Sequence, residues 1–159
     1  RSGWERYEPP PEGLPFRAFV RMLAHRRVAR MLRDRSTRRR KHAAWYFERL
    51  TALTPEEIEL PREVVPEGRH IYNQFTVRVK QGRRDALQAH LKARGIGSAI
   101  YYPIALHEQP CFQYLGYAKG QLPATELACQ EVLSLPVYPE MTEAMLEDVA
   151  QGLLSFFGK

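Results

Sequence analysis

Cysteine is scarce in this chain, and long apolar runs are missing. Cys111 and Cys129 are the only cysteines in 159 residues, and their separation fits neither a disulfide framework nor a four-cysteine zinc site. This composition favours a reducing compartment. No apolar run approaches the roughly 20 residues that a membrane-spanning helix needs, and no signal peptide is visible. We therefore expect a cytoplasmic protein that does not span a membrane.

Motifs of catalytic sites are also missing. The five histidines are scattered, without the spacing of a metal site or a nucleophile–base pair. There is no P-loop, and the short segment Gly95-Ile96-Gly97 is typical of a helix end rather than a dinucleotide-binding loop. No pair of carboxylates stands out for acid–base chemistry. Taken by themselves, the residues predict no catalytic group and no metal ligand.

The charge is unevenly distributed. Residues 1–41 contain 13 of the 24 Lys and Arg residues and four of the 18 acidic residues, a net charge of +9, whereas residues 42–159 carry −3. We therefore divide the chain into a basic, Pro- and Arg-rich arm (1–37) and a mildly acidic body (38–159). Because the chain begins with Arg1 rather than Met, we expect the start of the gene product to be missing.

Three explanations of the arm stay open. It is a solvated, partly helical face, or a truncated or frame-shifted segment that is not native sequence, or an arm that binds nucleic acid by neutralising phosphates. No zinc-finger spacing, aromatic RNA-binding motif or basic zipper accompanies it.

Periodicity predicts helices interrupted by short strands. The first part of the chain reads as an extended lead-in (1–15), a ragged helix (16–35), a clearer helix (37–53) ended by Thr54-Pro55, and a loop (55–70). The rest reads as a strand (71–79), a helix (83–94), a strand (98–102), a short helix (107–115), a helix (123–133), an extended segment (133–138) and a last helix capped by Thr142.

The predicted helices have apolar faces that we expect to point inward. These faces are Ala86, Leu87 and Leu91, then Ala124, Leu127 and Ala128, and finally Met145, Val149, Leu153, Phe156 and Phe157. The strand–helix–strand order fits a crossover unit or half of a small α+β sandwich. We predict an α+β fold of the α/β small-domain type, with helices packed on a small sheet.

Two polar clusters are candidate binding sites. Tyr101 and Tyr102 end a predicted strand, and His107 and Gln109 follow in the loop. Such loops commonly carry binding groups, and Tyr and His combine an apolar body with a polar tip that suits a sugar or nucleotide. The alternative is that the tyrosines only pack against the core and its rim. The amides of Asn73-Gln74, in an otherwise apolar strand, indicate either a hydrogen-bonding site or an edge strand.

Several segments carry a resemblance to a known family. They are RRRKHAAWYFERL (38–50), RHIYNQFTVRV (69–79), RRDALQAHLKARGIGSAIYYPIALHEQPCFQYLGY (83–117) and LPATELACQEVLSLPVYPEMTEAMLEDV (122–149). In this order they resemble the C-terminal part of the DegT/DnrJ/EryC1/StrS family of pyridoxal-phosphate-dependent sugar aminotransferases. The resemblance covers about residues 38–157, and the arm departs from it.

The resemblance implies the small domain of a fold-type I aminotransferase, which is usually a homodimer. Such enzymes transfer an amino group, commonly from glutamate, to a keto-sugar nucleotide, with pyridoxal 5′-phosphate as the electron sink. The subgroup resembled most acts on UDP-linked 3-keto sugars. The motif implies that His107 is a substrate-side residue, that Tyr101 and Tyr102 line the same wall, and that Gln109 supports it.

The family's Schiff-base lysine and phosphate-binding groups lie upstream, in the large domain. None of the five lysines here stands in that motif, so we expect this chain to bind no cofactor and to be inactive alone. Two alternatives stay open. One is a non-enzymatic module whose arm contacts nucleic acid or another polyanion; the other is a small domain that holds a nucleotide sugar between Tyr101 and Gln109.

Overall fold

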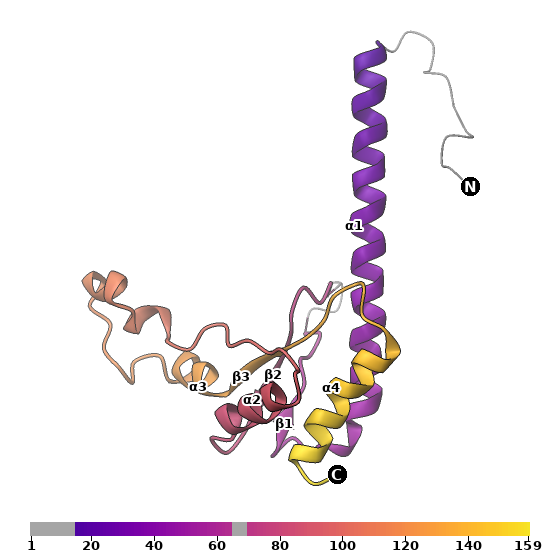
Figure 1. The fold of residues 1–159 in the computed structure, drawn as a ribbon. Helices are drawn as coiled ribbons and strands as arrows, with labels where there is room; N and C mark the ends of the chain where they lie inside the picture. Colours follow the sequence, from indigo (N-terminus) through magenta and orange to yellow (C-terminus); the bar gives the residue numbers. More distant parts are fainter. Residues whose placement is uncertain (1–14, 65–69) are drawn as a thin grey trace. The chain divides into compact units, whose positions relative to one another are not determined.

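The computed structural model describes residues 15–64 and 70–159 (Figure 1). The chain divides into two compact units, residues 1–35 and 36–159. The helices expected over 16–35 and 37–53 form one element, α1 (Phe16–Arg49), which a short 3-10 turn, η1 (Leu50–Ala52), follows. The helical conformation thus ends ahead of Thr54-Pro55, as predicted. Apart from Pro15, the expected lead-in lies outside the described residues.

The body is a three-stranded sheet with helices packed on it, which confirms the predicted α+β fold. After α1 and η1, its elements are β1 (Ile58–Glu59), β2 (Phe75–Val79), α2 (Arg84–Ala93), η2 (Leu106–Glu108), η3 (Pro110–Leu115), α3 (Pro123–Glu131), β3 (Val132–Leu135) and α4 (Glu143–Phe156). The strand order is β1-β2-β3, and both neighbouring pairs are antiparallel. Of the expected strand–helix–strand unit, the segment at Ala99 makes one antiparallel bridge to Ser134 of β3, so it runs in the same direction as β2 with β3 between them.

Three strand predictions need correction. The strand expected over 71–79 begins only at Phe75, so Asn73 and Gln74 lie exposed in a bend before it. The strand expected over 98–102 is reduced to one bridge, between Ala99 and Ser134. In the expected loop, Ile58 pairs with Val79. Pairing partners distant in sequence decide each case, and local composition does not reveal them.

The core forms around the central strand. Phe75, Val77 and Val79 alternate with half-buried residues along β2 and are fully buried. The ring centroid of Phe75 lies 5.1 Å from that of Tyr46 and 5.3 Å from that of Phe47, both on α1. Burying each side chain of this size contributes about 1.5–3 kcal/mol. The last turns of α1 are therefore part of the core.

The inward helix faces were predicted only in part. On α2, Leu87 and Leu91 are buried as expected, but Ala86 is exposed. No residue of α3 is buried, so its expected stripe is wrong, and Leu127 is 47% exposed. Apolar spacing alone does not show whether a neighbouring element covers a helix face.

The last helix docks on the body as expected, although its buried face is shifted. Thr142 Oγ1 accepts a hydrogen bond from the Met145 N–H and caps the helix, as predicted. Met145 is 44% exposed, whereas Leu146, Val149, Ala150, Gly152 and Leu153 are buried. A Cβ atom on Gly152 would lie 2.8 Å from Leu91 Cδ2, so α2 and α4 approach too closely for a larger residue.

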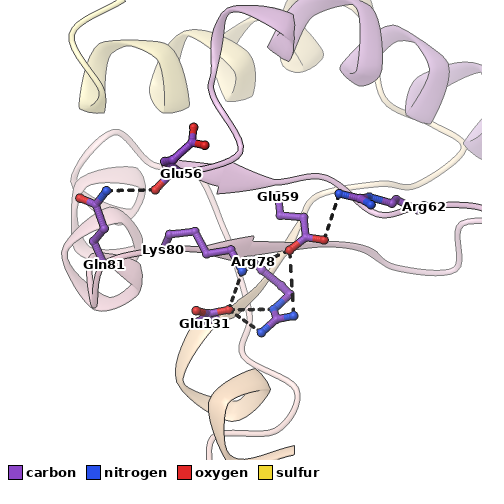
Figure 2. A network of polar contacts seen from close by, with 7 residues as sticks. All are labelled: Glu56, Glu59, Arg62, Arg78, Lys80, Gln81 and Glu131. Carbon is purple, nitrogen blue, oxygen red and sulfur yellow. Dashed lines mark hydrogen bonds and ion pairs between the residues drawn. The ribbon is translucent and has the colours of Figure 1, made fainter. Parts of the chain in front are cut away.

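An ionic network joins the sheet to the end of α3 (Figure 2). Glu131 accepts hydrogen bonds from Arg78 Nε at 2.8 Å and Lys80 Nζ at 2.9 Å. Lys80 also pairs with Glu59 at 3.1 Å, and Arg62 lies 3.5 Å from Glu59. The hydrogen bond from Lys80 is the first cause that lowers the pKa of Glu59. The network fastens β1, β2 and the α3–β3 junction to one another.

Within the described ranges, no helix is both long enough and apolar enough to cross a membrane.

Candidate functional site

A groove of about 960 Å³ runs beside the end of β3. Four parts of the body line it: the bend before β2, the turn after α2, the segment that follows β3, and the first half of α4. The lining residues are Asn73, Gln74, Arg94, Gly95, Ile96, Gly97, Ser98, Ala99, Tyr101, Ser134, Leu135, Pro136, Val137, Tyr138, Met141, Met145, Asp148 and Val149. Its volume is at the upper end of the range for small-molecule sites.

The groove combines an apolar base with polar groups. Leu135, Val137, Met141 and Val149 are buried core residues that reach its lining. The polar side chains of the lining are more open: Asn73, Gln74, Arg94 and Asp148 are exposed. Few polar groups on an apolar base are typical of sites that orient an organic ligand.

Two tyrosines add aromatic surface to the groove. Tyr101 is 50% exposed and Tyr138 is 41% exposed, so both rings are open to a ligand. The Tyr138 hydroxyl donates to Met145 Sδ at 3.6 Å. Aromatic faces, amides, a guanidinium and a carboxylate together can stack on a sugar or base and hydrogen-bond its hydroxyl groups.

The residues predicted for the site separate into two places. Tyr101 lines the groove together with Asn73-Gln74, so the structure joins parts of the two predicted clusters. Tyr102 is 62% exposed and is not part of the groove lining, although its ring packs edge-on against Tyr101. His107 and Gln109 are also outside the groove lining.

His107 is buried and already hydrogen-bonded. Its Nε2 lies 3.0 Å from Glu126 Oε1, and its side chain is 5% exposed. The Gly120 N–H donates to the same carboxylate oxygen at 2.7 Å. Burial raises the pKa of Glu126, but hydrogen bonds from Gly120, His107 and Leu122 outweigh burial and hold this pKa below its ordinary value. Two donors thus converge on one carboxylate oxygen of Glu126, which is the acceptor of both hydrogen bonds.

Gln109 makes its hydrogen bonds within its own loop. Its Nε2 donates to the Ile104 carbonyl at 3.3 Å, and its Oε1 accepts a weak hydrogen bond from Cys111 Sγ at 3.9 Å. These contacts keep the side chain within its own segment.

Sequence reasoning missed Arg94, Tyr138 and Asp148. Arg94 is the last residue before a helix-ending glycine, and Asp148 lies on an exposed helix position. Neither position carries a motif. Only the packing of α4 beside the α2 turn places these side chains in one groove.

The groove lacks the amine that pyridoxal phosphate needs. Its lining contains no lysine, and Lys80 is engaged by Glu59 and Glu131 elsewhere. The residues of the groove therefore do not fit the cofactor by themselves. Among the residues that the structure describes, no group of three or more His, Cys, Asp or Glu side chains is placed to hold a metal ion.

The chain is similar to proteins of one family. The sequence profile of the DegT/DnrJ/EryC1/StrS aminotransferase family matches residues 25–154, so the match includes residues 25–37, which the resemblance had left out. A pleiotropic regulatory protein of Geobacillus stearothermophilus is 44% identical over 126 residues, which is 78% of this chain and 33% of the relative.

Two further proteins are similar to this chain. The UDP-N-acetyl-3-dehydro-alpha-D-glucosamine 3-aminotransferase of Acidithiobacillus ferrooxidans is 40% identical over 113 residues, 70% of this chain and 28% of the relative. The crystal structure of S. venezuelae DesV in complex with a ketimine intermediate superposes with a TM-score of 0.75 at 32% identity, covering 89% of this chain and 36% of DesV.

The chain thus spans about a third of the length of the proteins it matches. The family consists of pyridoxal-phosphate-dependent aminotransferases, and relatives in it are sugar aminotransferases. With a profile match over most of its length and a structural neighbour of the same fold, the chain belongs to the DegT/DnrJ/EryC1/StrS aminotransferase family.

Proposed function

We propose that this chain is the C-terminal small domain of a pyridoxal-phosphate-dependent nucleotide-sugar aminotransferase. The observation that carries the proposal is the family match over residues 25–154, together with 40% identity to an enzyme named for 3-amination of a UDP-linked keto sugar. The reaction is amino transfer, with glutamate as the donor, to a keto-sugar nucleotide. The complete enzyme is a cytoplasmic homodimer.

The groove is the part of the domain that we assign to the substrate side. Tyr101, Asn73 and Gln74 line it with exposed side chains. Amides and a tyrosine hydroxyl suit the hydroxyl and acetamido groups of a sugar, since each amide both donates and accepts hydrogen bonds. Arg94 adds a cation that suits a phosphate oxygen.

The cofactor is held by groups outside this chain. The groove lining has no lysine, and the chain matches only 33% and 28% of the length of two relatives. We therefore infer that the chain contributes binding surface and orientation, and that it is inactive alone.

A chimera tests the proposed function. In the Acidithiobacillus enzyme, the matching C-terminal segment is replaced by residues 38–159 of this chain, and amino transfer from glutamate to the UDP-linked keto sugar is measured. We expect turnover that needs added pyridoxal phosphate. A dimeric chimera that carries the cofactor but transfers no amino group contradicts the proposal.

A matched pair of variants tests the groove in the same chimera. Gln74→Ala removes an exposed amide from the groove, whereas Gln130→Ala removes an exposed amide from α3. We expect the first change to raise KM by about five- to tenfold, the effect of losing one hydrogen bond to a neutral group. The second change is expected to leave KM unchanged. Equal values for the two variants contradict the assignment of the groove.

A cofactor test on the 159-residue chain complements these assays. The chain is incubated with equimolar pyridoxal phosphate, reduced with borohydride and weighed by intact mass spectrometry. We expect no stoichiometric adduct. A single lysine modified in full contradicts the inference that the cofactor site lies outside the chain.

A second candidate function follows from the charge of α1. Residues 17–41 contain eleven cations and one acid, and most of the cations are exposed. Such a helix can bind nucleic acid or another polyanion by counterion release. Binding of duplex DNA, followed by fluorescence anisotropy, is then expected to weaken steeply with salt and to vanish when residues 1–41 are deleted. Undetectable or salt-independent binding removes this candidate.

A further inference from the structure

The segment between the bridge at Ala99 and helix α3 has a different construction from the rest of the body. This excursion (residues 101–122) leaves the sheet, makes the two 3-10 turns η2 and η3, and returns to the start of α3 (Figure 1). Only Ala105 and His107 are buried in it. Apolar burial therefore contributes little to its conformation.

The excursion nevertheless exposes many large apolar side chains. Nine exposed residues lie in it or just after it: Tyr101, Tyr102, Ile104, Leu106, Tyr114, Leu115, Tyr117, Leu122 and Leu127. In water, a segment with many exposed apolar side chains tends to bury them against one another unless other contacts hold its conformation. Specific contacts therefore have to hold its conformation.

One carboxylate oxygen closes the excursion. Glu126 Oε1, in the first turn of α3, accepts from His107 Nε2 at 3.0 Å and from the Gly120 N–H at 2.7 Å. His107 lies near the beginning of the excursion and Gly120 near its end. The three groups therefore tie both limbs of the excursion to α3, and the His107 and Glu126 side chains are 5% and 12% exposed.

The protonation of the pair follows from the geometry. Glu126 Oε1 already accepts the Gly120 N–H, so the His107 contact with the same oxygen is made by a proton on Nε2. The other ring nitrogen, Nδ1, is buried and has no hydrogen-bond partner among the described residues. The ring of Tyr117 packs edge-on against the imidazole, with centroids 6.3 Å apart. The imidazole is thus held through one nitrogen, on the side of Glu126.

We propose that His107 is a positioning residue that, through Glu126, holds the excursion (residues 101–122) in one conformation and so fixes the arrangement of its exposed tyrosines. The resemblance had implied that His107 faces the substrate; in this chain its side chain is 5% exposed and hydrogen-bonded to Glu126. That the positioned tyrosines serve the substrate side rests on the proposed function. That His107 holds the excursion in one conformation does not rest on it.

Two substitutions of His107 separate this hydrogen bond from simple packing. Glutamine places its amide nitrogen close to the position of Nε2, whereas asparagine places it close to the position of Nδ1. His107→Gln therefore keeps a donor toward Glu126, and His107→Asn loses it. Amide hydrogen exchange of the full 159-residue chain, read by mass spectrometry, reports the excursion and the core in separate peptides.

We expect His107→Asn to speed exchange in peptides of residues 103–122 by about tenfold or more, as for the loss of a charge-assisted hydrogen bond. Peptides that contain β2 and α2 are expected to exchange as in the wild type. His107→Gln is expected to stay within about threefold of the wild type. Equal exchange in the excursion for all three proteins overturns the proposal, and so does equal loosening by both substitutions.

A change on the other side of the contact guards against misfolding of the His107 variants. Glu126→Ala removes the acceptor and leaves His107 in place, so we expect the same local increase in exchange. The double variant His107→Asn with Glu126→Ala is expected to exchange no faster than the faster single variant, because both lose one contact. Additive effects overturn the proposal. None of these readouts needs cofactor or sugar, so a failed chimera leaves this result unaffected.

Discussion

The core around β2 and the excursion (residues 101–122) are stabilised by different kinds of contact. Along β2, every second residue is fully buried, and aromatic rings from α1 surround Phe75. In the excursion, most large side chains are exposed, and hydrogen bonds to Glu126 carry the conformation. Regions held by apolar burial open only with global unfolding, whereas regions held by a few polar contacts open locally.

The largest effect is expected from breaking the core. Phe75→Ala removes a fully buried ring that contacts Tyr46 and Phe47. We expect a loss of about 3–5 kcal/mol in the free energy of unfolding, from lost burial and the cavity that remains. Urea unfolding followed by circular dichroism measures it. A loss below about 1 kcal/mol contradicts the assignment of Phe75 to the core.

The ionic network is expected to have the next largest effect. Glu131 is 12% exposed and receives both Arg78 and Lys80. Glu131→Gln leaves two cations with a neutral acceptor, and we expect a loss of about 1–3 kcal/mol in the free energy of unfolding. Arg62→Gln is the matched control: its side chain is 74% exposed, so less than about 0.5 kcal/mol is expected. Equal losses for the two variants contradict a partly buried network.

The dependence of stability on alkaline pH tests the surroundings of Tyr72, a buried residue of the core. Burial, followed by the hydrogen bond to Glu63, raises the pKa of Tyr72 from 10.0 to about 12. A raised pKa means that the folded state favours the neutral phenol. The stability from Tyr72 is therefore complete below pH 10 and is lost as the pH rises toward 12.

Tyr72→Phe checks this dependence. We expect a loss of about 0.5–1.5 kcal/mol at neutral pH, for one hydrogen bond, and a shallower fall in stability between pH 10 and 12. Burial also raises the pKa of Tyr46, so part of the fall persists. Urea midpoints measured across this range supply the comparison. An unchanged slope contradicts the raised pKa of Tyr72.

The smallest effect is expected in the excursion. Tyr114 is 79% exposed, so Tyr114→Ala is expected to change the free energy of unfolding by no more than about 0.5 kcal/mol. The same urea titration measures this change beside Phe75→Ala. A loss that approaches that of Phe75→Ala contradicts the contrast between the two regions.

The sequence predicted much of the fold because several signals are local. Thr142 is a capping residue at a helix start, and Gly95 has the positive φ of a helix end. The strand over 98–102 failed because its residues have strand propensity but only Ala99 finds a partner, Ser134. Strand pairing depends on distant residues, and propensity does not contain that information.

The candidate site was predicted less completely. Tyr101 and Asn73-Gln74 were recognised as polar or aromatic positions in unusual surroundings, and all three line the groove. The sequence did not indicate the partner of His107, because it does not show that Glu126, 19 residues later, reaches the imidazole. Arg94 and Asp148 gave no signal, since an exposed charged residue is ordinary both after a helix end and on a helix surface.

By itself, the sequence determined the family, the α+β class, the end of α2 at Gly95 and the start of α4 at Thr142, because motif order, apolar spacing and capping residues are local properties of the chain. Tertiary structure alone decided the antiparallel sheet, the composition of the groove and the environment of His107. These features join residues far apart in the chain. Their contacts contribute to the free energy of folding only after burial and strand pairing have brought those residues together.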